Sequence, residues 1–247
     1  MLRIGVLSFR TAAKGRLCPL PRFAGADIGA AMTNSPRPRL YLVTPQLGDP
    51  ASFLRDLGPV LEAGDIAALL LRLEPADERA LINRAKSVAA VVQRRDVALL
   101  LDGHPELAAR AGADGAHLFG IDALTAAIGA LKPDRIAGAG GLRTRHDAML
   151  AGEAGADYVM FGDPDRRGGR PPLEAVTERL TWWSELVEIP CVGYAGSRDE
   201  ILPLAQAGAD FIALGEWIWT QGEAPAAAVA AAAALVAAPA SEAGLDR

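Results

Sequence analysis

Asp102 and Asp122 each follow a short apolar run of this 247-residue chain and could together hold a divalent metal ion. Carboxylate oxygens are the ligands that Mg2+ takes from proteins, and one or two of them suffice where a bound diphosphate supplies further oxygens. An Asp at the start of a helix also caps it, and Asp122 stands close to the start of an expected helix. The pattern therefore predicts an Mg2+ site on Asp102 and Asp122, with helix capping as the alternative.

Three arginines lie among glycines in the segment 163–172, between an apolar run and a helix-like stretch. They are Arg166, Arg167 and Arg170. Guanidinium groups bind phosphate oxygens through two parallel hydrogen bonds, so this segment could close over a monophosphate or a diphosphate. A solvated charge run is the equally weighted alternative.

Glycines follow two later apolar runs, at Ala195-Gly196-Ser197 and at Gly215-Glu216. Backbone N–H groups at Ala195, Gly196 and Gly215 could face a phosphate, because a glycine lets the ligand approach the backbone closely. The alternative is that the glycines serve only tight turns. Glu216 argues against a dianion here unless its side chain points away.

These residues need elements that bring them together, and a repeated turn shows how the chain supplies them. Ala-Gly-Asp or Ala-Gly-Ala-Asp recurs at 63–65, 111–114, 154–157 and 207–210, each time between a helix-like stretch and an apolar run. The Gly ends the helix in a left-handed conformation and the small Ala allows close packing. Eight short apolar runs alternate with helix-like stretches, at 40–44, 67–71, 97–101, 115–118, 135–138, 158–161, 191–194 and 211–214.

Eightfold alternation of this kind predicts a (β/α)8 TIM barrel in a single domain, with active-site loops at the carboxyl ends of its strands. An open doubly wound sheet is the weaker alternative, because no Gly-x-Gly-x-x-Gly follows the first run. We expect the barrel over residues 39–239. Residues 1–38, which lack periodicity, are expected to form a disordered extension, and residues 240–247 a flexible tail.

Composition limits the classes of partner. A formal charge of -5 and a pI near 5.3 leave no basic surface for nucleic acid. The apolar run at 4–9 is too short for a signal peptide or a membrane span. Cys18 and Cys191 are far apart and support neither a disulfide framework nor a zinc site, so a cytoplasmic location is expected.

Several ordered pieces of the chain resemble the thiamine phosphate synthase and thiazole tautomerase superfamily over about residues 39–222. The pieces are LYLVT at 40–44, LR at 71–72, AGADGAHL at 111–118, AGADYVMFG at 154–162 and IPCV at 189–192. The resemblance implies a (β/α)8 barrel whose synthase joins hydroxymethylpyrimidine diphosphate to thiazole phosphate with Mg2+ and releases diphosphate. In that chemistry the pyrimidine ionises before the thiazole nitrogen attacks, so neutralising the diphosphate is the main task of the site.

Only some of the residues with which the family binds diphosphate and metal are kept in this chain. Its Gln-x-Arg-x-Lys after the second strand reads Leu70, Arg72 and Glu74 here, so the Arg is kept and the Lys is reversed in charge. Its Asn-Asp after the third strand reads Asp102-Gly103. The resemblance implies that Asp122 is the second metal Asp and that Arg72 binds diphosphate, with Asp102 standing in for the missing ligand.

Most of the family's site residues after the fifth to eighth strands are also replaced in this chain. The family's Ser after the fifth strand falls at Gly141, its Gly-Gly after the seventh strand at Ala195-Gly196, and its Ser after the eighth strand at Glu216. The Thr-rich loop after the sixth strand is replaced by the segment with Arg166, Arg167 and Arg170. The tautomerase's catalytic His aligns near Arg143, which disfavours tautomerase activity.

We therefore expect a synthase-type transferase that acts on small phosphorylated substrates. The alternative is a non-catalytic or re-purposed paralogue that binds a phosphorylated thiamine precursor or a partner. Small barrels of this kind often associate, so a homo-oligomer is also expected.

Overall fold

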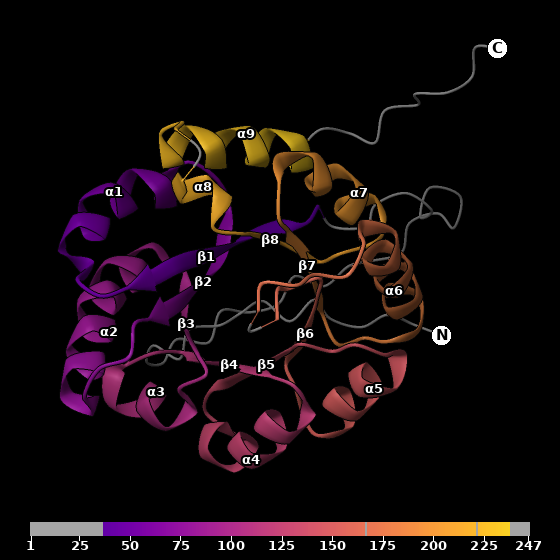
Figure 1. Cartoon of the computed structure of the whole chain (residues 1–247), viewed down its shortest axis with the longest axis horizontal. Coiled ribbons are helices and arrows are strands. Elements are labelled where there is room, and N and C mark those ends of the chain that lie inside the picture. The colour runs from indigo at the N-terminus through magenta and orange to yellow at the C-terminus, as the bar shows by residue number, and fades with distance from the viewer. Residues whose placement is uncertain (1–36, 166, 221, 238–247) are drawn as a thin grey trace, which may run out of the picture.

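Eight parallel strands form a closed barrel in chain order, with β8 pairing to β1 (Figure 1). The computed structural model describes residues 37–165, 167–220 and 222–237. The strands are β1 (Arg39–Leu47), β2 (Ile66–Leu73), β3 (Ala98–Asp102), β4 (Gly115–Phe119), β5 (Ile136–Gly140), β6 (Tyr158–Phe161), β7 (Cys191–Ala195) and β8 (Phe211–Leu214). The expected (β/α)8 fold is confirmed, and the open doubly wound sheet is excluded.

Helices surround the barrel on its outer side (Figure 1). They are α1 (Pro50–Glu62), α2 (Glu78–Val92), α3 (Pro105–Ala111), α4 (Ile121–Leu131), α5 (Arg145–Glu153), α6 (Leu173–Leu186), α7 (Ile201–Gln206), α8 (Trp217–Thr220) and α9 (Pro225–Ala237). Local sequence explains several of the starts, since the side chain of Asp49 caps α1 and Thr144 with Asp147 forms a capping box on α5. No helix of the described residues is long and apolar enough to cross a membrane.

The expected extension over 1–38 and tail over 240–247 fall almost wholly outside the described residues. Only Arg37 and Pro38 of the extension are described, and they lie just before β1.

The repeated Ala-Gly-Ala-Asp turns join neighbouring strands through their aspartates. Asp114 accepts a hydrogen bond from Leu99 N–H at 2.8 Å and returns one from its own N–H to Leu99 C=O. Asp157 forms the same reciprocal pair with Ala137, and Asp210 with Cys191. Each aspartate precedes an even-numbered strand and binds the odd-numbered strand before it. The turns therefore do more than end a helix, because each one fixes two strands at their amino ends.

A polar row crosses the apolar interior of the barrel. Tyr41, Tyr158 and His117 are buried, and the two tyrosine hydroxyls are 2.9 Å apart. Nδ1 of His117 lies 2.8 Å from the Tyr158 hydroxyl. Leu70, Leu100 and Val192 are among the apolar side chains that fill the same interior. Buried polar groups persist where they are hydrogen-bonded to one another, and this row meets that condition.

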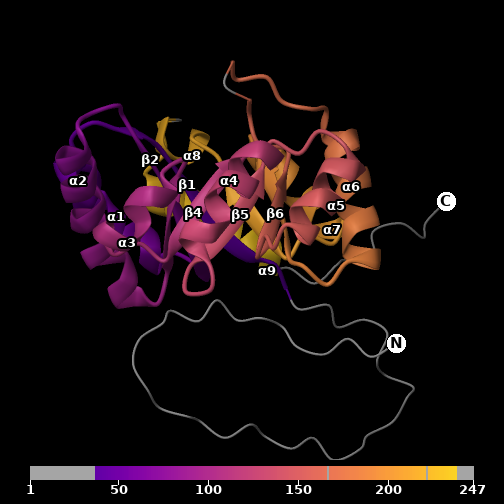
Figure 2. The same ribbon diagram turned by 90° about the horizontal axis from the view of Figure 1, so that it is seen from below.

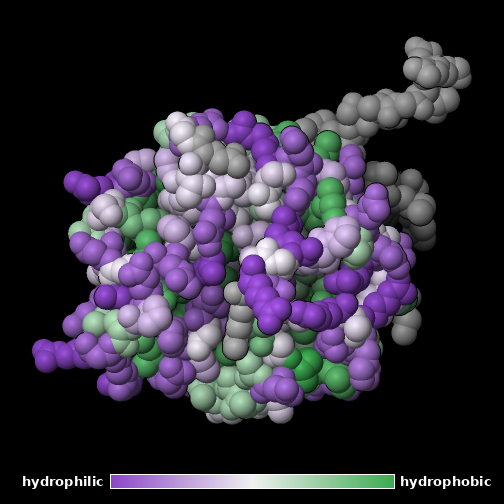
Figure 3. Space-filling view, in the orientation of Figure 1, coloured by the Kyte–Doolittle hydropathy of each residue, from purple (hydrophilic) through white to green (hydrophobic). Residues whose placement is uncertain are grey.

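The carboxyl ends of the strands all open on one side of the molecule. The described residues of the β6–α6 loop, 162–165 and 167–172, rise above that side (Figure 2). Hydrophilic side chains gather at the middle of this face (Figure 3). Polar side chains therefore lie at the end of the barrel where TIM barrels carry their active sites.

Candidate active site

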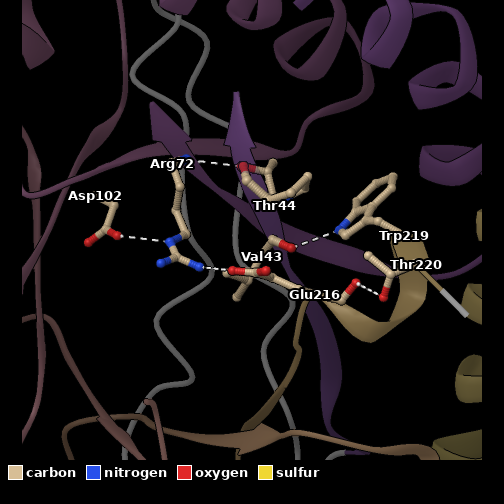
Figure 4. A network of polar contacts seen from close by, with 8 residues as sticks. Val43, Thr44, Arg72, Asp102, Glu216, Trp219 and Thr220 are labelled. Carbon is tan, nitrogen blue, oxygen red and sulfur yellow. Dashed lines mark hydrogen bonds and ion pairs between the residues drawn. The ribbon is translucent and has the colours of Figure 1, made fainter. Parts of the chain in front are cut away.

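Arg72 on β2 contacts residues of β1, β3 and the segment after β8 near the carboxyl side of the barrel (Figure 4). Its backbone N–H donates to Oγ1 of the buried Thr44 at 3.0 Å, which ties β2 to β1. Its guanidinium Nε is 3.3 Å from Asp102 Oδ2 at the end of β3, and Nη1 forms an ion pair with Glu216 Oε1 beyond β8. The structure thus brings together three of the residues that the sequence predicted for the site.

The two carboxylates more than balance the charge of Arg72. The side chains of Arg72, Asp102 and Glu216 are 24%, 33% and 46% exposed. Ion pairs that face water in this way contribute about 1 kcal/mol or less each, so they are exchangeable. A diphosphate offers more charge and more acceptor oxygens than either carboxylate, and it can compete for Arg72.

Asp122 lies on the first turn of α4, with its side chain exposed. The helix is capped by Gly120 rather than by an aspartate side chain, so the capping alternative does not apply to Asp122. Asp102 is engaged by Arg72. In the described part of the chain, Asp122 forms no ion pair and no group of three or more His, Cys, Asp or Glu side chains is arranged for a metal.

Arg170 is held at the start of the β6–α6 loop and at β7. It donates to Gly162 C=O at 2.8 Å, to Tyr194 C=O at 2.9 Å, and to both carboxylate oxygens of Glu200. Its guanidinium also lies 5.0 Å from the centre of the Tyr194 ring. Arg170 therefore closes the loop onto the barrel in this structure.

Glu200 occupies the place where the sequence suggested a bound anion. Its Oε2 accepts the Gly196 N–H at 2.8 Å as well as the bond from Arg170. Although partial burial raises the pKa of Glu200, the Arg170 and Gly196 hydrogen bonds outweigh it and hold that pKa below its ordinary value. The N–H of Gly215 is also used, since it donates to Ala195 C=O at 3.1 Å. Sequence reasoning missed Glu200, because it lies in a short helical turn rather than directly after a strand.

The tip of the β6–α6 loop is shaped by Asp165. Its Oδ1 accepts the N–H groups of Arg167 and Gly169 at 2.8 and 2.9 Å. These bonds hold the pKa of Asp165 below its ordinary value. Arg167 is exposed, and Arg166 lies outside the described residues. Arg143, at the tautomerase's histidine position, is 3.7 Å from Asp165.

Asp163 is a site residue that the sequence analysis did not single out. It follows β6 by two residues, and its Oδ2 accepts the N–H of Gly141 at 2.9 Å. Burial raises the pKa of Asp163 to about 7, against the lowering effect of the Gly141 bond. The sequence feature that could have identified Asp163 is its position as the first charged residue after the sixth apolar run. The bond also gives Gly141 a structural role next to a carboxyl group.

Glu74 stands one residue past β2 and is exposed. Its carboxylate lies against Gly48, where it would collide with any side chain at that position. Among the described residues it forms no ion pair. The side chain therefore rests on the turn after β1.

Comparisons with known proteins agree with this geometry. The family model described as thiamine monophosphate synthase matches residues 40–218. A thiamine-phosphate synthase of Rhodospirillum centenum is 44% identical over 195 residues, covering 78% of this chain and 94% of the relative. One of Hyphomonas neptunium is 41% identical over 210 residues, covering 81% and 94%. A solved thiamine phosphate pyrophosphorylase from Pyrococcus furiosus has a TM-score of 0.66 at 24% identity, covers 81% of this chain and 96% of its own, and supports the fold.

Proposed function

Because the chain belongs to the thiamine monophosphate synthase family, we propose that it joins hydroxymethylpyrimidine diphosphate to thiazole phosphate and releases diphosphate. It is a transferase of thiamine biosynthesis that acts on small phosphorylated substrates. The observation that carries this conclusion is the extent of the family match, which runs from β1 to α8 and includes every strand end that forms the site.

The reaction breaks the C–O bond between the pyrimidine methylene and the diphosphate, and forms a C–N bond to the thiazole nitrogen. The leaving diphosphate takes the electron pair of the broken bond, so the site must stabilise a growing negative charge. Arg72 is the residue that we assign to this task, because its exposed pairs with Asp102 and Glu216 can be exchanged for diphosphate oxygens. Arg166 and Arg167 are proposed to add charge from the β6–α6 loop.

Mg2+ is proposed as the cofactor. Asp102 and Asp122 would hold it, and their carboxylate oxygens are of the type that Mg2+ prefers. When bound, the ion would neutralise charge on the diphosphate. Asp102 would then be shared between the ion and Arg72, since the two already form a pair.

The thiazole phosphate is proposed to bind at the ends of β7 and β8, near Ala195, Gly196 and Gly215. Glu200 now holds the Gly196 N–H, so a phosphate that uses this donor has to displace the carboxylate. A cytoplasmic location and a homo-oligomeric state remain proposals as well. The location is proposed from the cysteine content, and the homo-oligomeric state from the frequent association of small barrels.

A non-catalytic paralogue that binds a phosphorylated precursor is the second candidate. Two observations favour it: Arg72 is paired with two carboxylates, and Glu74 carries a negative charge where the family has a Lys. Binding of either precursor without product formation would identify this function.

The test is to incubate both precursors with the full chain and Mg2+ and to measure thiamine phosphate and diphosphate. We expect equimolar products, and we expect Arg72→Ala to lower the rate at least tenfold. Arg79→Ala is the matched control, because Arg79 is exposed on the first turn of α2 and forms no ion pair with a described residue. Absence of product with intact precursor binding would overturn the synthase assignment.

A further inference from the structure

The carboxylate of Glu200 is surrounded by donors of the kind that bind phosphate. Its Oε2 accepts the Gly196 N–H at 2.8 Å and a bond from Arg170 Nη2 at 2.7 Å, and its Oε1 accepts from Arg170 Nη1 at 3.1 Å. One backbone N–H and both Nη atoms of one guanidinium thus meet the same carboxylate. This combination of donors is one that proteins use for phosphate oxygens. An oxyanion therefore fits at this place.

Arg170 lies directly over the backbone of Gly196. A Cβ built on Gly196 would lie 2.7 Å from Arg170 Cζ, so a glycine leaves the room that the guanidinium occupies. Arg170 also donates to Gly162 C=O at 2.8 Å and to Tyr194 C=O at 2.9 Å. These two bonds do not involve Glu200. Arg170 is therefore held beside Gly196 even when the carboxylate moves away.

Glu200 is the exchangeable member of this group. Its side chain is 20% exposed, so the carboxylate borders water. Rotation about the side-chain bonds is enough to withdraw it, without a change in the backbone. The Gly215 N–H, in contrast, donates to the backbone C=O of Ala195, which is fixed in β7. Of these two N–H groups, the one of Gly196 is held by a movable side chain.

Charge makes the Glu200 carboxylate and a phosphate mutually exclusive. Partial burial raises the pKa of Glu200, but the bonds from Arg170 and Gly196 outweigh it and keep the pKa below its ordinary value. The carboxylate is therefore charged at neutral pH. A phosphate at the same donors would be repelled by this charge. Phosphate has to replace the carboxylate, and Arg170 then pairs with the more highly charged partner.

We propose that Glu200 is an internal competitor for phosphate at the end of β7, and that binding of the phosphate transfers Arg170 from the carboxylate to the ligand. This inference rests on the proposed function and adds to it a regulation of the phosphate site. The structure shows the closed state, with Glu200 in place. A site whose open state is populated at about one tenth binds its ligand about tenfold more weakly. Glu200 therefore sets the affinity for phosphate.

The transfer links the phosphate site to the β6–α6 loop. Arg170 belongs to this loop, and its ion pair with Glu200 connects the loop to the turn Arg198–Glu200. Withdrawal of the carboxylate without a replacement removes this connection, and a bound phosphate restores it. The order of the loop thus depends on whether an anion, from the protein or from the ligand, is paired with Arg170. A carboxylate with a purely structural role would create no dependence on phosphate.

The first experiment measures the Kd of inorganic phosphate by calorimetry for the full chain and two variants. Glu200→Gln removes the charge, and Glu200→Ala removes the competing group and keeps the assay informative if the first variant folds poorly. Both variants should lower the Kd about tenfold. Asp199→Asn is the matched control, because Asp199 is an exposed carboxylate in the same turn and has no described bond to Arg170 or Gly196. The control should leave the Kd within about twofold, since it removes a charge but no competitor.

The second experiment follows hydrogen exchange of the described loop residues, 162–165 and 167–172, with and without saturating phosphate. Without phosphate, Glu200→Gln should exchange faster than the wild type, because Arg170 has lost its ion pair. Added phosphate should return the variant to the wild-type rate. In the wild type the rate should not change, because one partner of Arg170 replaces another.

Two outcomes would overturn the inference. Unchanged, weaker or undetectable phosphate binding in both Glu200 variants would show that the carboxylate does not compete. Faster loop exchange that phosphate fails to reverse would show that Arg170 does not reach the ligand. Tighter phosphate binding by the variants, together with no thiamine phosphate from the wild type, would refute the proposed function alone. Product formation with an unchanged phosphate Kd would refute the competitor alone.

Discussion

The carboxyl group of Asp163 makes the folded protein sensitive to pH near neutrality. Its pKa is about 7 in the folded state, above the ordinary value of 3.8, because burial disfavours the charged form. The folded state therefore retains a proton that the unfolded chain loses. The stability gained in this way is fully present below about pH 4 and is lost as the pH rises through 7.

Asp163→Asn should remove this dependence. Between pH 5 and pH 8 the wild type should lose about 2–3 kcal/mol of unfolding free energy that the variant keeps, because the folded state holds the Asp163 proton up to about pH 7 and each pH unit is worth about 1.36 kcal/mol. Denaturant titrations at the two pH values measure it. A constant difference between the two proteins would show that the Asp163 carboxyl does not titrate in this range.

Glu74 is the residue at which the charge of the site departs most from the family. A carboxylate about 4 Å from a diphosphate oxygen costs roughly 4 kcal/mol per unit charge at an effective dielectric constant of about 20. In this structure the Glu74 carboxylate lies against Gly48. Glu74→Lys should lower the Kd of the pyrimidine diphosphate by about tenfold, which is about 1.4 kcal/mol.

Glu153→Lys is the matched control for Glu74→Lys, because it makes the same charge change on an exposed residue at the end of α5. Adding Leu70→Gln restores the family's second position but places an amide in the apolar interior, so the double variant should be less stable. If neither Glu74→Lys nor the double variant with Leu70→Gln binds the pyrimidine diphosphate, the site around Arg72 serves another ligand.

Single residues were predictable where a strand end fixes them. Arg72, Asp102 and Glu216 follow apolar runs within one or two residues, and parallel strands bring such positions together. The Tyr41–Tyr158–His117 row could not be found in this way, because its contacts depend on which interior positions face one another across the barrel. Distances of 41 and 117 residues along the chain separate those partners.

At the scale of elements, the β6–α6 loop depends on one arginine. Arg170 ties the loop to Gly162, to Tyr194 and to Glu200. Hydrogen bonds between charged groups contribute about 1.5–3 kcal/mol when partly buried. The loop should therefore be ordered mainly by this side chain and by the turn at Asp165.

Arg170→Ala should lower the free energy of unfolding by about 2 kcal/mol and increase hydrogen exchange at residues 162–172. Arg167→Ala removes an exposed arginine from the same loop and should leave both quantities unchanged. Faster exchange in both variants would mean that net charge, rather than the Arg170 anchor, orders the loop.

Strands and most helices could be located from the sequence because each strand is covered on both faces and reads as a continuous apolar run. All eight predicted runs coincide with β1 to β8. The short α8 was not predicted, because four residues with three large apolar side chains carry no helical period.

At the scale of the whole molecule, the described strands β1 to β8 by themselves form a closed barrel. Leu40 pairs with Ile66 of β2 and with Ile212 of β8, so the first strand is held on both edges. Deleting residues 1–31 should leave the midpoint of thermal unfolding unchanged within about 2 °C. A large fall in the midpoint would show that the segment contributes to the fold.

The aspartates of the repeated turns also bear on how fast the chain folds. Asp114, Asp157 and Asp210 bind partners only 15, 20 and 19 residues earlier, so each closes a short strand–helix–strand unit. Units with local contacts form before the distant pairing of β1 with β8. We expect Asp157→Asn to slow refolding more than it speeds unfolding in stopped-flow measurements, which places this turn in the folding transition state. A change confined to the unfolding rate would mean that the barrel closes first and that its pairs of strands are joined afterwards.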